Sequence, residues 1–414
     1  MVEEIGFEQI VSRGCGLDVH KKEIVATING TGLRKETRNF GATTRSLTEL
    51  KDWLLENGIT HVAMESTGVY WKPVFNILEP GGFTILVVNA RHIKYVPGHK
   101  TDKKDSAWIC KLLLGGLLKG SFVPDVSQRN LRDLTRYRRK LVGQQSAEKN
   151  RMIRIFEDAN LKLSSVFSDV TGATCTRIID SIIRGKEDPE ELIELCTHKN
   201  LKTSREEIKE AIRGHMTDHH RFMLSIIRKD IGNIQSLINE LDKKIENLML
   251  PYADEIARIS EIPGVGEQTA KELISEIGTD MSAFPTDGHL ASWAGMCPGN
   301  NESAGKKKSS RTTHGSKQVK AILSEAAWGA SRTKDTHLSV RYKKVAARRG
   351  KKRAIVAVGH TILRIVYHIL KDKVCYKELG VNFEDEKKRQ ARIKYHQQAL
   401  SELGAADFPE IKSA

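Results

Sequence analysis

The sequence predicts an α/β domain followed by two mostly helical regions. Up to residue 125, short apolar runs alternate with amphipathic helical patterns, as in a sheet flanked by helices. Between residues 224 and 248, isoleucine and leucine recur at alternating spacings of three and four, which indicates a long coiled-coil helix. We therefore expect an α/β domain over 10–125, a helical and coiled-coil region over 126–252, a mostly helical domain over 253–370 and a charged tail over 371–414.

Composition and charge narrow the class of partner. The 414-residue chain has 67 Lys and Arg against 52 Asp and Glu, and its net charge of +15 favours a polyanionic partner. Nucleic acid is the leading candidate, and an anionic membrane surface is the alternative. We see no apolar run of about 18 residues and no signal peptide, so we expect no membrane association. The six cysteines form no Cys-x-x-Cys pair, which argues against a zinc ribbon or disulfide framework and favours a reducing cytoplasm.

The α/β domain is predicted to begin with a three-stranded meander. Alternating residues in Gly14–His20 and Glu23–Ile28 indicate two strands, and the turn signal Asn29–Gly32 precedes a third, Leu33–Phe40. Helices then alternate with strands in the order helix Thr44–Glu56, strand His61–Glu65, helix Trp71–Leu78, strand Thr84–Val88 and a helix that contains Asp102 and Asp105. This is the order of elements in a ribonuclease-H-like domain, whose later strands run parallel to the first.

Four carboxylates are expected to converge in this sheet. Asp18 and Glu65 would lie on neighbouring strands, and Asp102 and Asp105 would face them from the last helix. The simpler alternative makes Asp102 a helix cap and Asp105 a favourable charge near the positive end of the helix dipole. An acid within an apolar strand is costly unless it has a partner or a metal, so the convergence favours a site for divalent cations. Nearby lysines give a positive field that suits a phosphate backbone, namely Lys100, Lys103 and Lys104.

These motifs resemble the DEDD transposases of bacterial insertion-sequence family one-ten, relatives of the Piv DNA invertase. The resemblance is carried by Leu17–His20, Met64–Gly68, Val88–Arg91 and Lys100–Ala107. It implies a RuvC-like nuclease domain that binds Mg²⁺, with Mn²⁺ as a substitute, through Asp18, Glu65, Asp102 and Asp105. The chain departs from the family at Ser106, where an alanine often follows the last acid.

The middle of the chain is basic and helical. Arginines between 132 and 140 suit either a solvated helix face or a helix that contacts a nucleic-acid backbone, and the candidates for contact are Arg136, Arg138 and Arg139. The apolar stripe from Leu224 to Leu248 needs a covering helix, which is either this basic helix or the same helix of another protomer. Polar residues interrupt the matching stripe of the basic helix. A cluster of histidines near residue 219 is more typical of a polar helix surface than of a metal site.

Pro251 ends the coiled coil, and a glycine-rich turn follows. Ile262–Ala270 has the Gly-x-Gly pattern of a helix-hairpin-helix, in which Gly264 and Gly266 let backbone N–H groups approach a DNA phosphate. A tight structural turn is the alternative. Farther along, the helix Val319–Ala330 offers Leu323 and Trp328 as core candidates, and a basic stretch, Arg341–Arg353, precedes an apolar helix.

The loop around Ser303 is the second candidate site. By residue type it is a Gly/Asn/Ser/Lys loop, and a lone loop serine is normally only a hydrogen-bonding group. The resemblance changes this interpretation, because Trp293, Gly295 and Pro298 match the family's Trp-x-Gly-x-x-Pro motif and Ser303 matches its proposed nucleophile. Ala304 replaces the usual glycine. Basic residues that would face DNA there are Lys306, Lys307, Lys308 and Arg311.

The sequence therefore predicts a transposase or recombinase that cleaves and exchanges DNA strands. The resemblance implies DNA element ends and target DNA as substrates, an element-encoded guide RNA, and a nucleoid-associated bacterial protein in the cytoplasm. A coiled coil that pairs protomers would give a dimer or tetramer. Two rivals remain: a metal-dependent endonuclease of Holliday-junction-resolvase type in which Ser303 is structural, and a non-enzymatic nucleic-acid-binding protein whose acids are caps and salt-bridge partners.

Overall fold

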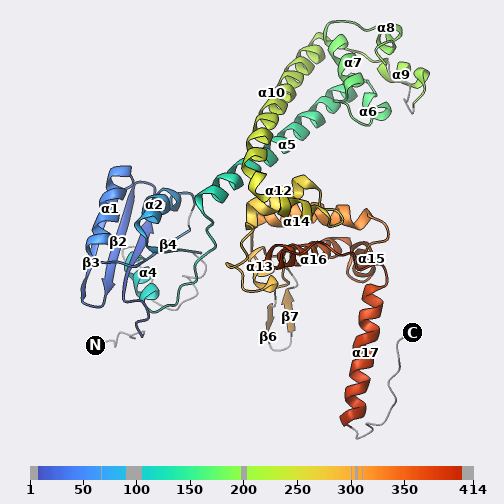
Figure 1. Cartoon of the computed structure of the whole chain (residues 1–414). Coiled ribbons are helices and arrows are strands. Elements are labelled where there is room, and N and C mark those ends of the chain that lie inside the picture. The colour runs from blue at the N-terminus through green and yellow to red at the C-terminus, as the bar shows by residue number, and fades with distance from the viewer. Residues whose placement is uncertain are drawn as a thin grey trace. The chain divides into compact units, whose positions relative to one another are not determined.

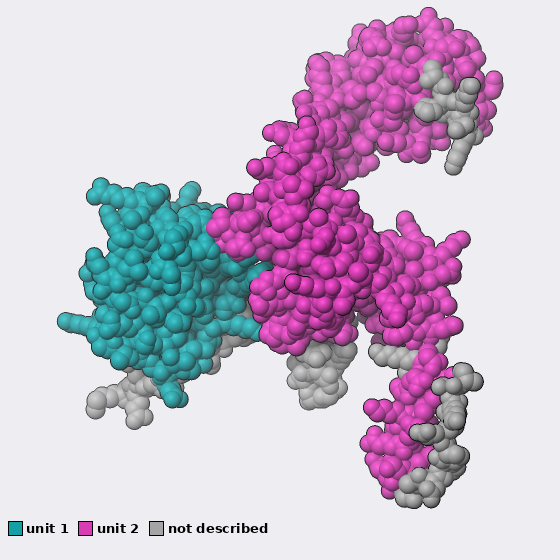
Figure 2. Space-filling view, viewed as in Figure 1, with its two compact units in different colours: residues 1–124 teal, residues 125–414 magenta. Residues whose placement is uncertain are grey.

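The computed structural model describes residues 8–66, 68–89, 105–196, 203–299, 301–303, 306–309 and 311–402, with the backbone alone at 301–303, 306–309, 384–385 and 387–388. The chain divides into two compact units, residues 1–124 and residues 125–414, which Figure 2 shows in different colours. Lys100, Asp102, Lys103 and Lys104 lie outside the described residues. Asp102 is therefore a sequence prediction alone.

The first unit is a five-stranded mixed sheet flanked by helices (Figure 1). Its strand order is β3-β2-β1-β4-β5; β1 is antiparallel to β2 and parallel to β4, and β4 is parallel to β5. The elements are β1 (Arg13–Val19), β2 (Glu23–Gly30), β3 (Leu33–Gly41), α1 (Thr44–Glu56), β4 (His61–Glu65), α2 (Trp71–Leu78), the 3₁₀ turn η1 (Glu79–Gly81), β5 (Thr84–Val88) and α4 (Asp105–Leu114). The predicted α/β domain, followed by a mostly helical region, is confirmed.

The two faces of the sheet have separate apolar cores because successive side chains on a strand point to opposite faces. On one face, Leu17 and Met64 pack with apolar residues of α1 and α2, including Leu50 and Val74. On the other face, Ala63 packs with residues of α4 such as Ile109 and Leu113, within a smaller cluster. Small residues at the centre of this second face leave room for α4 close to the backbone of the sheet.

The second unit begins with two long helices that pack along one another, α5 (Val126–Asp158) and α10 (Asp218–Met249) (Figure 1). The stripe on α10 predicted to need a cover is buried at Leu224, Ile227, Ile231, Ile234, Ile238 and Ile245, and α5 of the same chain is the cover. The polar interruptions of α5 find polar partners on α10. Arg138 pairs with Asp242, and Gln145 Nε2 donates to Gln235 Oε1 at 2.8 Å.

Short helices close the far end of this helical pair around a core of their own. This core contains Phe156 of α5, Ile178 of α7 and Leu224 of α10. The short helices are α6 (Leu163–Val166), α7 (Ala173–Ile183), α8 (Pro189–Ile193) and α9 (Arg205–Ile212). His220, from the histidine cluster, caps α10 through Thr217 and lies 3.0 Å from Asp158 Oδ2, so it has a structural role.

The rest of the second unit is mostly helical. It comprises η2 (Leu250–Tyr252), α11 (Ala253–Ser260), α12 (Glu267–Ile277), α13 (Asp287–Trp293), β6 (Asn301–Ser303), β7 (Lys306–Ser309), α14 (Lys317–Arg332), α15 (His337–Arg349), α16 (Lys351–Asp372) and α17 (Phe383–Glu402). By length and hydropathy α16 could cross a membrane, but it contacts α13, α14 and α15 and buries residues such as Val358, Ile362 and Val366. Leu323 is a core residue as predicted. Trp328 is not, because 44% of it is exposed.

Candidate functional site

Asp18 and Glu65 occupy matched positions on neighbouring parallel strands. The registered pairs of β1 and β4 end at Leu17 and Met64, and Asp18 and Glu65 are the next residues on the two strands. Leu17 and Met64 belong to the core on the face of α1, so alternation puts Asp18 and Glu65 on the face of α4. Both acids are half-buried. The sheet therefore brings these two predicted residues together at one edge of one face.

Gly16 sets the direction and the close approach of α4. A Cβ on Gly16 would overlap the carbonyl oxygen of Ser106 and the amide nitrogen of Cys110, and a Cβ on Gly14 would lie 3.0 Å from Leu113. The helix thus runs opposite to β1, with its first turn over Gly16 and its last turn over Gly14. Asp105, the first residue of α4, consequently lies toward the end of β1 that carries Asp18.

A chain of three hydroxyl groups fastens the first turn of α4 to the sheet. Ser106 Oγ lies 2.8 Å from Thr27 Oγ1, which lies 2.9 Å from Thr37 Oγ1. Ser106 is 3% exposed and Thr27 is fully buried. Buried hydroxyls are costly unless they are hydrogen-bonded, so Ser106 and Thr27 depend on this contact, whereas Thr37 is exposed. Ser106 stands where the family often has alanine, and its hydroxyl therefore has a structural role.

His20 is a neighbour of the site that the sequence analysis did not single out. Its Nε2 lies 3.0 Å from Asp18 Oδ2, and the residue itself comes directly after the end of β1. The histidine is 57% exposed and Asp18 is 20% exposed, so solvent or a substrate reaches this contact. The nearby thiol of Cys110 is a poor nucleophile, because burial raises its pKa to about 11.

The chemistry of the placed donors suits a hard divalent cation. Asp18, Glu65 and Asp105 carry carboxylate oxygens, the kind of ligand that Mg²⁺ prefers. Within the described part of the chain, no group of three or more His, Cys, Asp or Glu side chains is close enough to hold a metal ion. Asp102, the fourth predicted ligand, lies outside it. The donor set fits a metal in chemical type, and its completeness remains a prediction.

Ser303 lies in a β-hairpin instead of the predicted irregular loop. It ends β6, and its backbone pairs with Lys306 at the start of β7. Below it, Pro298 and Thr312 form a further antiparallel bridge, and Gly299 N donates to Arg311 O at 2.8 Å. The side chains of Ser303, Lys306, Lys307 and Lys308 lie outside the described part. Arg311 is exposed.

Two glycines join the base of this hairpin. A Cβ on Gly295 would lie 2.8 Å from Gly315 N, and a Cβ on Gly315 would overlap Gly295 N. Gly295 also has a φ of +69°, which favours glycine. The two backbones thus touch where the chain enters and leaves the hairpin. Gly295 of the Trp-x-Gly-x-x-Pro motif is therefore required for packing.

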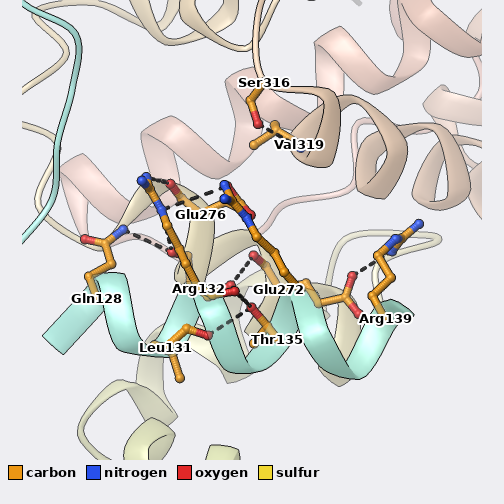
Figure 3. Close-up of polar contacts among 11 residues, drawn as sticks. Gln128, Leu131, Arg132, Thr135, Arg139, Glu272, Glu276, Ser316 and Val319 are labelled. Carbon is orange, nitrogen blue, oxygen red and sulfur yellow. Dashed lines mark hydrogen bonds and ion pairs between the residues drawn. The ribbon is translucent and has the colours of Figure 1, made fainter. Parts of the chain in front are cut away.

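The arginines proposed to contact a nucleic-acid backbone are held by carboxylates of the second unit. Arg136 donates to both carboxylate oxygens of Glu276 at 2.6 and 2.8 Å, and these hydrogen bonds raise the pKa of Arg136. Arg139 pairs with Glu272 at 2.8 Å and also with Glu325. Figure 3 shows Arg132 and Arg139 on α5 reaching toward the acids of α12. This surface joins α5 to α12, and its contact with nucleic acid stays a prediction.

The helix-hairpin-helix pattern is formed by α11 and α12, and its two glycines have different surroundings. Gly264 has a φ of +83°, and a Cβ there would overlap the Ala326 carbonyl oxygen and the Ala330 amide of α14. Gly266 is exposed at the start of α12, and a Cβ there would meet nothing within 4 Å. Packing thus explains Gly264, and the open backbone at Gly266 remains available to a phosphate.

Two family models match the chain. A DEDD transposase model of the IS110 group, described as a transposase, matches residues 15–160. A second model, described as the transposase IS116/IS110/IS902 family, matches residues 256–343. The first match contains Asp18, Glu65 and Asp105. The second contains Gly264, Gly266 and Ser303. No curated protein matches the chain.

Proposed function

The chain belongs to the IS110 family of DEDD transposases, and from this premise we propose that it cuts and rejoins insertion-sequence DNA at a carboxylate centre formed by Asp18, Glu65, Asp102 and Asp105. The family establishes a DNA transposase or recombinase and a divalent metal. The particular metal, the four ligands and the serine chemistry are our proposal.

The observation that carries the proposal is the matched placement of Asp18 and Glu65 on the face of α4. The strand order β3-β2-β1-β4-β5, with its antiparallel meander and parallel later strands, supports a RuvC-like nuclease fold for the first unit. In that fold Asp105 begins the helix that packs on the face of the sheet to which the two strand acids belong. His20 orients the Asp18 carboxylate through their 3.0 Å contact.

Asp18, Glu65, Asp102 and Asp105 would hold Mg²⁺, with Mn²⁺ as a substitute. When bound, two such ions activate the attacking oxygen and stabilise the leaving oxygen of a phosphoryl transfer. The residues of the chain supply the negative donors, and α4 holds Asp105 at a fixed distance from the sheet through Ser106. Lys100, Lys103 and Lys104 would lie along the DNA backbone beside this centre.

Ser303 is the proposed nucleophile of the second domain. Its hydroxyl oxygen attacks a DNA phosphorus, and the bond from that phosphorus to the adjoining deoxyribose oxygen breaks. The serine proton ends on the departing oxygen, which leaves one DNA end with a hydroxyl and the other joined to Ser303. Attack by a DNA hydroxyl on this linkage rejoins the strand and frees the serine. Lys306, Lys307, Lys308 and Arg311 would stabilise the negative charge that develops.

Partners and location follow from the same premise. We assign DNA element ends and target DNA as substrates, an element-encoded guide RNA as partner, and the bacterial nucleoid as location. A dimer or tetramer would not use the buried stripe of α10, because α5 of the same chain covers it. Exposed apolar residues on the outer face of α10, Phe222, Ile226 and Leu237, suit a contact between protomers.

The test is a denaturing-gel assay with labelled element-junction DNA, Mg²⁺ and candidate element RNA. The wild-type protein should give a covalent protein–DNA band that disappears in Ser303→Ala and in Asp18→Asn. Equal cleavage by wild type and Ser303→Ala without a covalent band would instead support the metal-only endonuclease. Binding of DNA without cleavage under every metal and RNA condition would support the non-enzymatic alternative.

A further inference from the structure

Trp328 is the most exposed of the five tryptophans of this protein. The structure describes all five tryptophans, and the other four are buried or half-buried. Trp328 lies on α14 and is 44% exposed. Its ring centroid is 6.2 Å from that of Tyr342 on α15, and the guanidinium carbon of Arg332 lies 5.8 Å from its ring centroid. Arg332 is also exposed, so the aromatic pair and the cation together form an accessible surface.

The helix beside this surface is strongly basic. No acidic residue occurs between Asp335 and Asp372, whereas eight basic residues fall in 341–353: Arg341, Lys343, Lys344, Arg348, Arg349, Lys351, Lys352 and Arg353. Among the described residues, no ion pair joins Lys343, Arg348 or Arg349 to a carboxylate. This differs from α5, where acids of α12 hold the arginines. The charges of Lys343, Arg348 and Arg349 are thus left for a polyanion.

The aromatic surface also lies beside the helix-hairpin-helix. Gly329, the residue after Trp328, packs against the hairpin so closely that a Cβ on it would lie 3.1 Å from Gly264 Cα. The exposed Gly266 belongs to the same hairpin. Trp328 therefore follows the hairpin contact by one residue in sequence, and its ring lies beside Tyr342 of the basic helix.

We propose that Trp328, with Tyr342 and Arg332, stacks an unpaired base of a nucleic-acid strand whose phosphates lie along α15. The proposal rests on the proposed function only in taking nucleic acid as the substrate. The ligand should be an unpaired nucleotide, because the bases of a duplex stack on one another and cannot also stack on a protein side chain. A base stacked on an aromatic side chain contributes about 1–3 kcal/mol, and basic groups follow the backbone without reading its sequence. A protein partner for an apolar patch would not explain eight basic residues on the adjoining segment.

The experiment measures binding to the full-length protein without requiring cleavage. The probes are a short oligothymidylate, an oligouridylate, an abasic strand of the same length and a blunt duplex. The variants are Trp328→Leu, which keeps an apolar side chain but removes the ring system, and Trp328→Phe, which keeps an aromatic ring. Tyr395→Leu is the matched control, because Tyr395 is 70% exposed on α17 and distant in sequence. Intrinsic tryptophan fluorescence reports stacking directly.

Trp328→Leu should weaken binding of a base-containing single strand by about 10-fold, since about 1.4 kcal/mol corresponds to a factor of ten. It should leave the abasic strand and the duplex unchanged, and it should abolish the fluorescence quenching seen in the wild type. Trp328→Phe should bind nearly as tightly as the wild type, and Tyr395→Leu should be indistinguishable from it. A selective loss for thymidylate identifies DNA as the source of the strand, a selective loss for uridylate identifies RNA, and an equal loss admits both.

Two results would overturn the proposal. One is unchanged binding of both base-containing strands by Trp328→Leu. The other is an equal loss for abasic and base-containing strands, which would show that the residue acts on the backbone or on folding. Because the experiment measures only binding, it remains valid for a protein that does not cleave DNA.

Discussion

The hydroxyl groups of Ser106 and Thr27 meet at 2.8 Å and join the first turn of α4 to the sheet. Ser106 follows Asp105, and Thr27 pairs across the sheet with Gly16, two residues before Asp18. The contact therefore fixes one candidate ligand relative to another through buried groups. We infer that Ser106 and Thr27 are positioning residues for the carboxylate centre.

Removing either hydroxyl should impair catalysis more than folding. Thr27→Val keeps the shape of the side chain but leaves Ser106 without this partner, at a cost of about 1–3 kcal/mol. We expect slower cleavage and a higher Mg²⁺ concentration for half-maximal rate, because Asp105 is less well held. Thr27→Ser should restore both values. Ser146→Ala, which removes an exposed hydroxyl bonded within its own helix, is the control. An unchanged Mg²⁺ requirement in Thr27→Val would contradict the positioning role.

Gly16→Ala should destabilise the first unit severely. Its methyl group would overlap backbone atoms of Ser106 and Cys110, which cannot move away without displacing α4. Overpacking of this kind typically costs about 1–3 kcal/mol or more. Gly143→Ala is the opposite control, because nothing lies within 4 Å of a Cβ there, in the middle of α5. It should stabilise its helix by up to about 1 kcal/mol. Thermal melting of the two variants should therefore shift in opposite directions.

The elements of the sheet were predictable because each has a local signal. Alternation marks β1 and β2, and Asn29–Gly32 marks the turn after them. Pairing of α5 with α10 was left open, since the interruptions at Arg138 and Gln145 weaken the stripe of α5. The structure resolves this through Asp242 and Gln235, polar partners about a hundred residues away in sequence.

Other features have no local signal. Thr37, Thr27 and Ser106 come from three elements, and a chain of hydroxyl groups across elements has no sequence pattern. The prediction that Trp328 is a core residue was wrong. The position of an aromatic residue on a helix does not by itself show which face of the helix packs against the core. The two strand acids could be predicted because an acid in an apolar strand stands out against its neighbours.

Substitutions of the two helix-hairpin-helix glycines, Gly264 and Gly266, should distinguish a role in packing from a role in DNA contact. Gly264→Ala should lower the melting temperature, because its Cβ would overlap α14 and its positive φ disfavours alanine. Gly266→Ala should fold normally, because its surroundings are open, yet weaken binding of a random-sequence duplex by obstructing approach of a phosphate. Full duplex affinity in a folded Gly266→Ala protein would remove this hairpin from the DNA contact.

Stability should depend on Glu378 in acid. Burial of its carboxyl raises the pKa, but hydrogen bonds from the His337 N–H, the Tyr376 hydroxyl and the Gly380 N–H together lower the pKa from 4.5 to about 2. As the pH falls, Glu378 therefore becomes protonated near pH 4.5 in the unfolded chain but only near pH 2 in the folded chain. The stabilising contribution is complete above pH 4.5 and disappears as the pH falls toward 2.

The measurement is melting temperature against pH for wild type and two matched variants. Glu378→Gln should melt lower than wild type at neutral pH and should lose less on acidification, so that the two curves approach each other at low pH. Glu56→Gln, which changes an exposed acid at the end of α1, should follow the wild-type curve. Parallel curves for wild type and Glu378→Gln would show that Glu378 is not the acid-sensitive group.

The central claim is that Asp18 and Glu65 act as one centre, and single-turnover cleavage of element-junction DNA tests it most directly. Asp18→Asn and Glu65→Gln should each reduce the rate by about 10³-fold or more, and the double variant should be little slower than either, because residues that act as a unit are not additive. Asp52→Asn, an exposed acid on α1, should cleave at the wild-type rate. Wild-type cleavage by either single variant, in a protein that still melts like the wild type, would contradict the account.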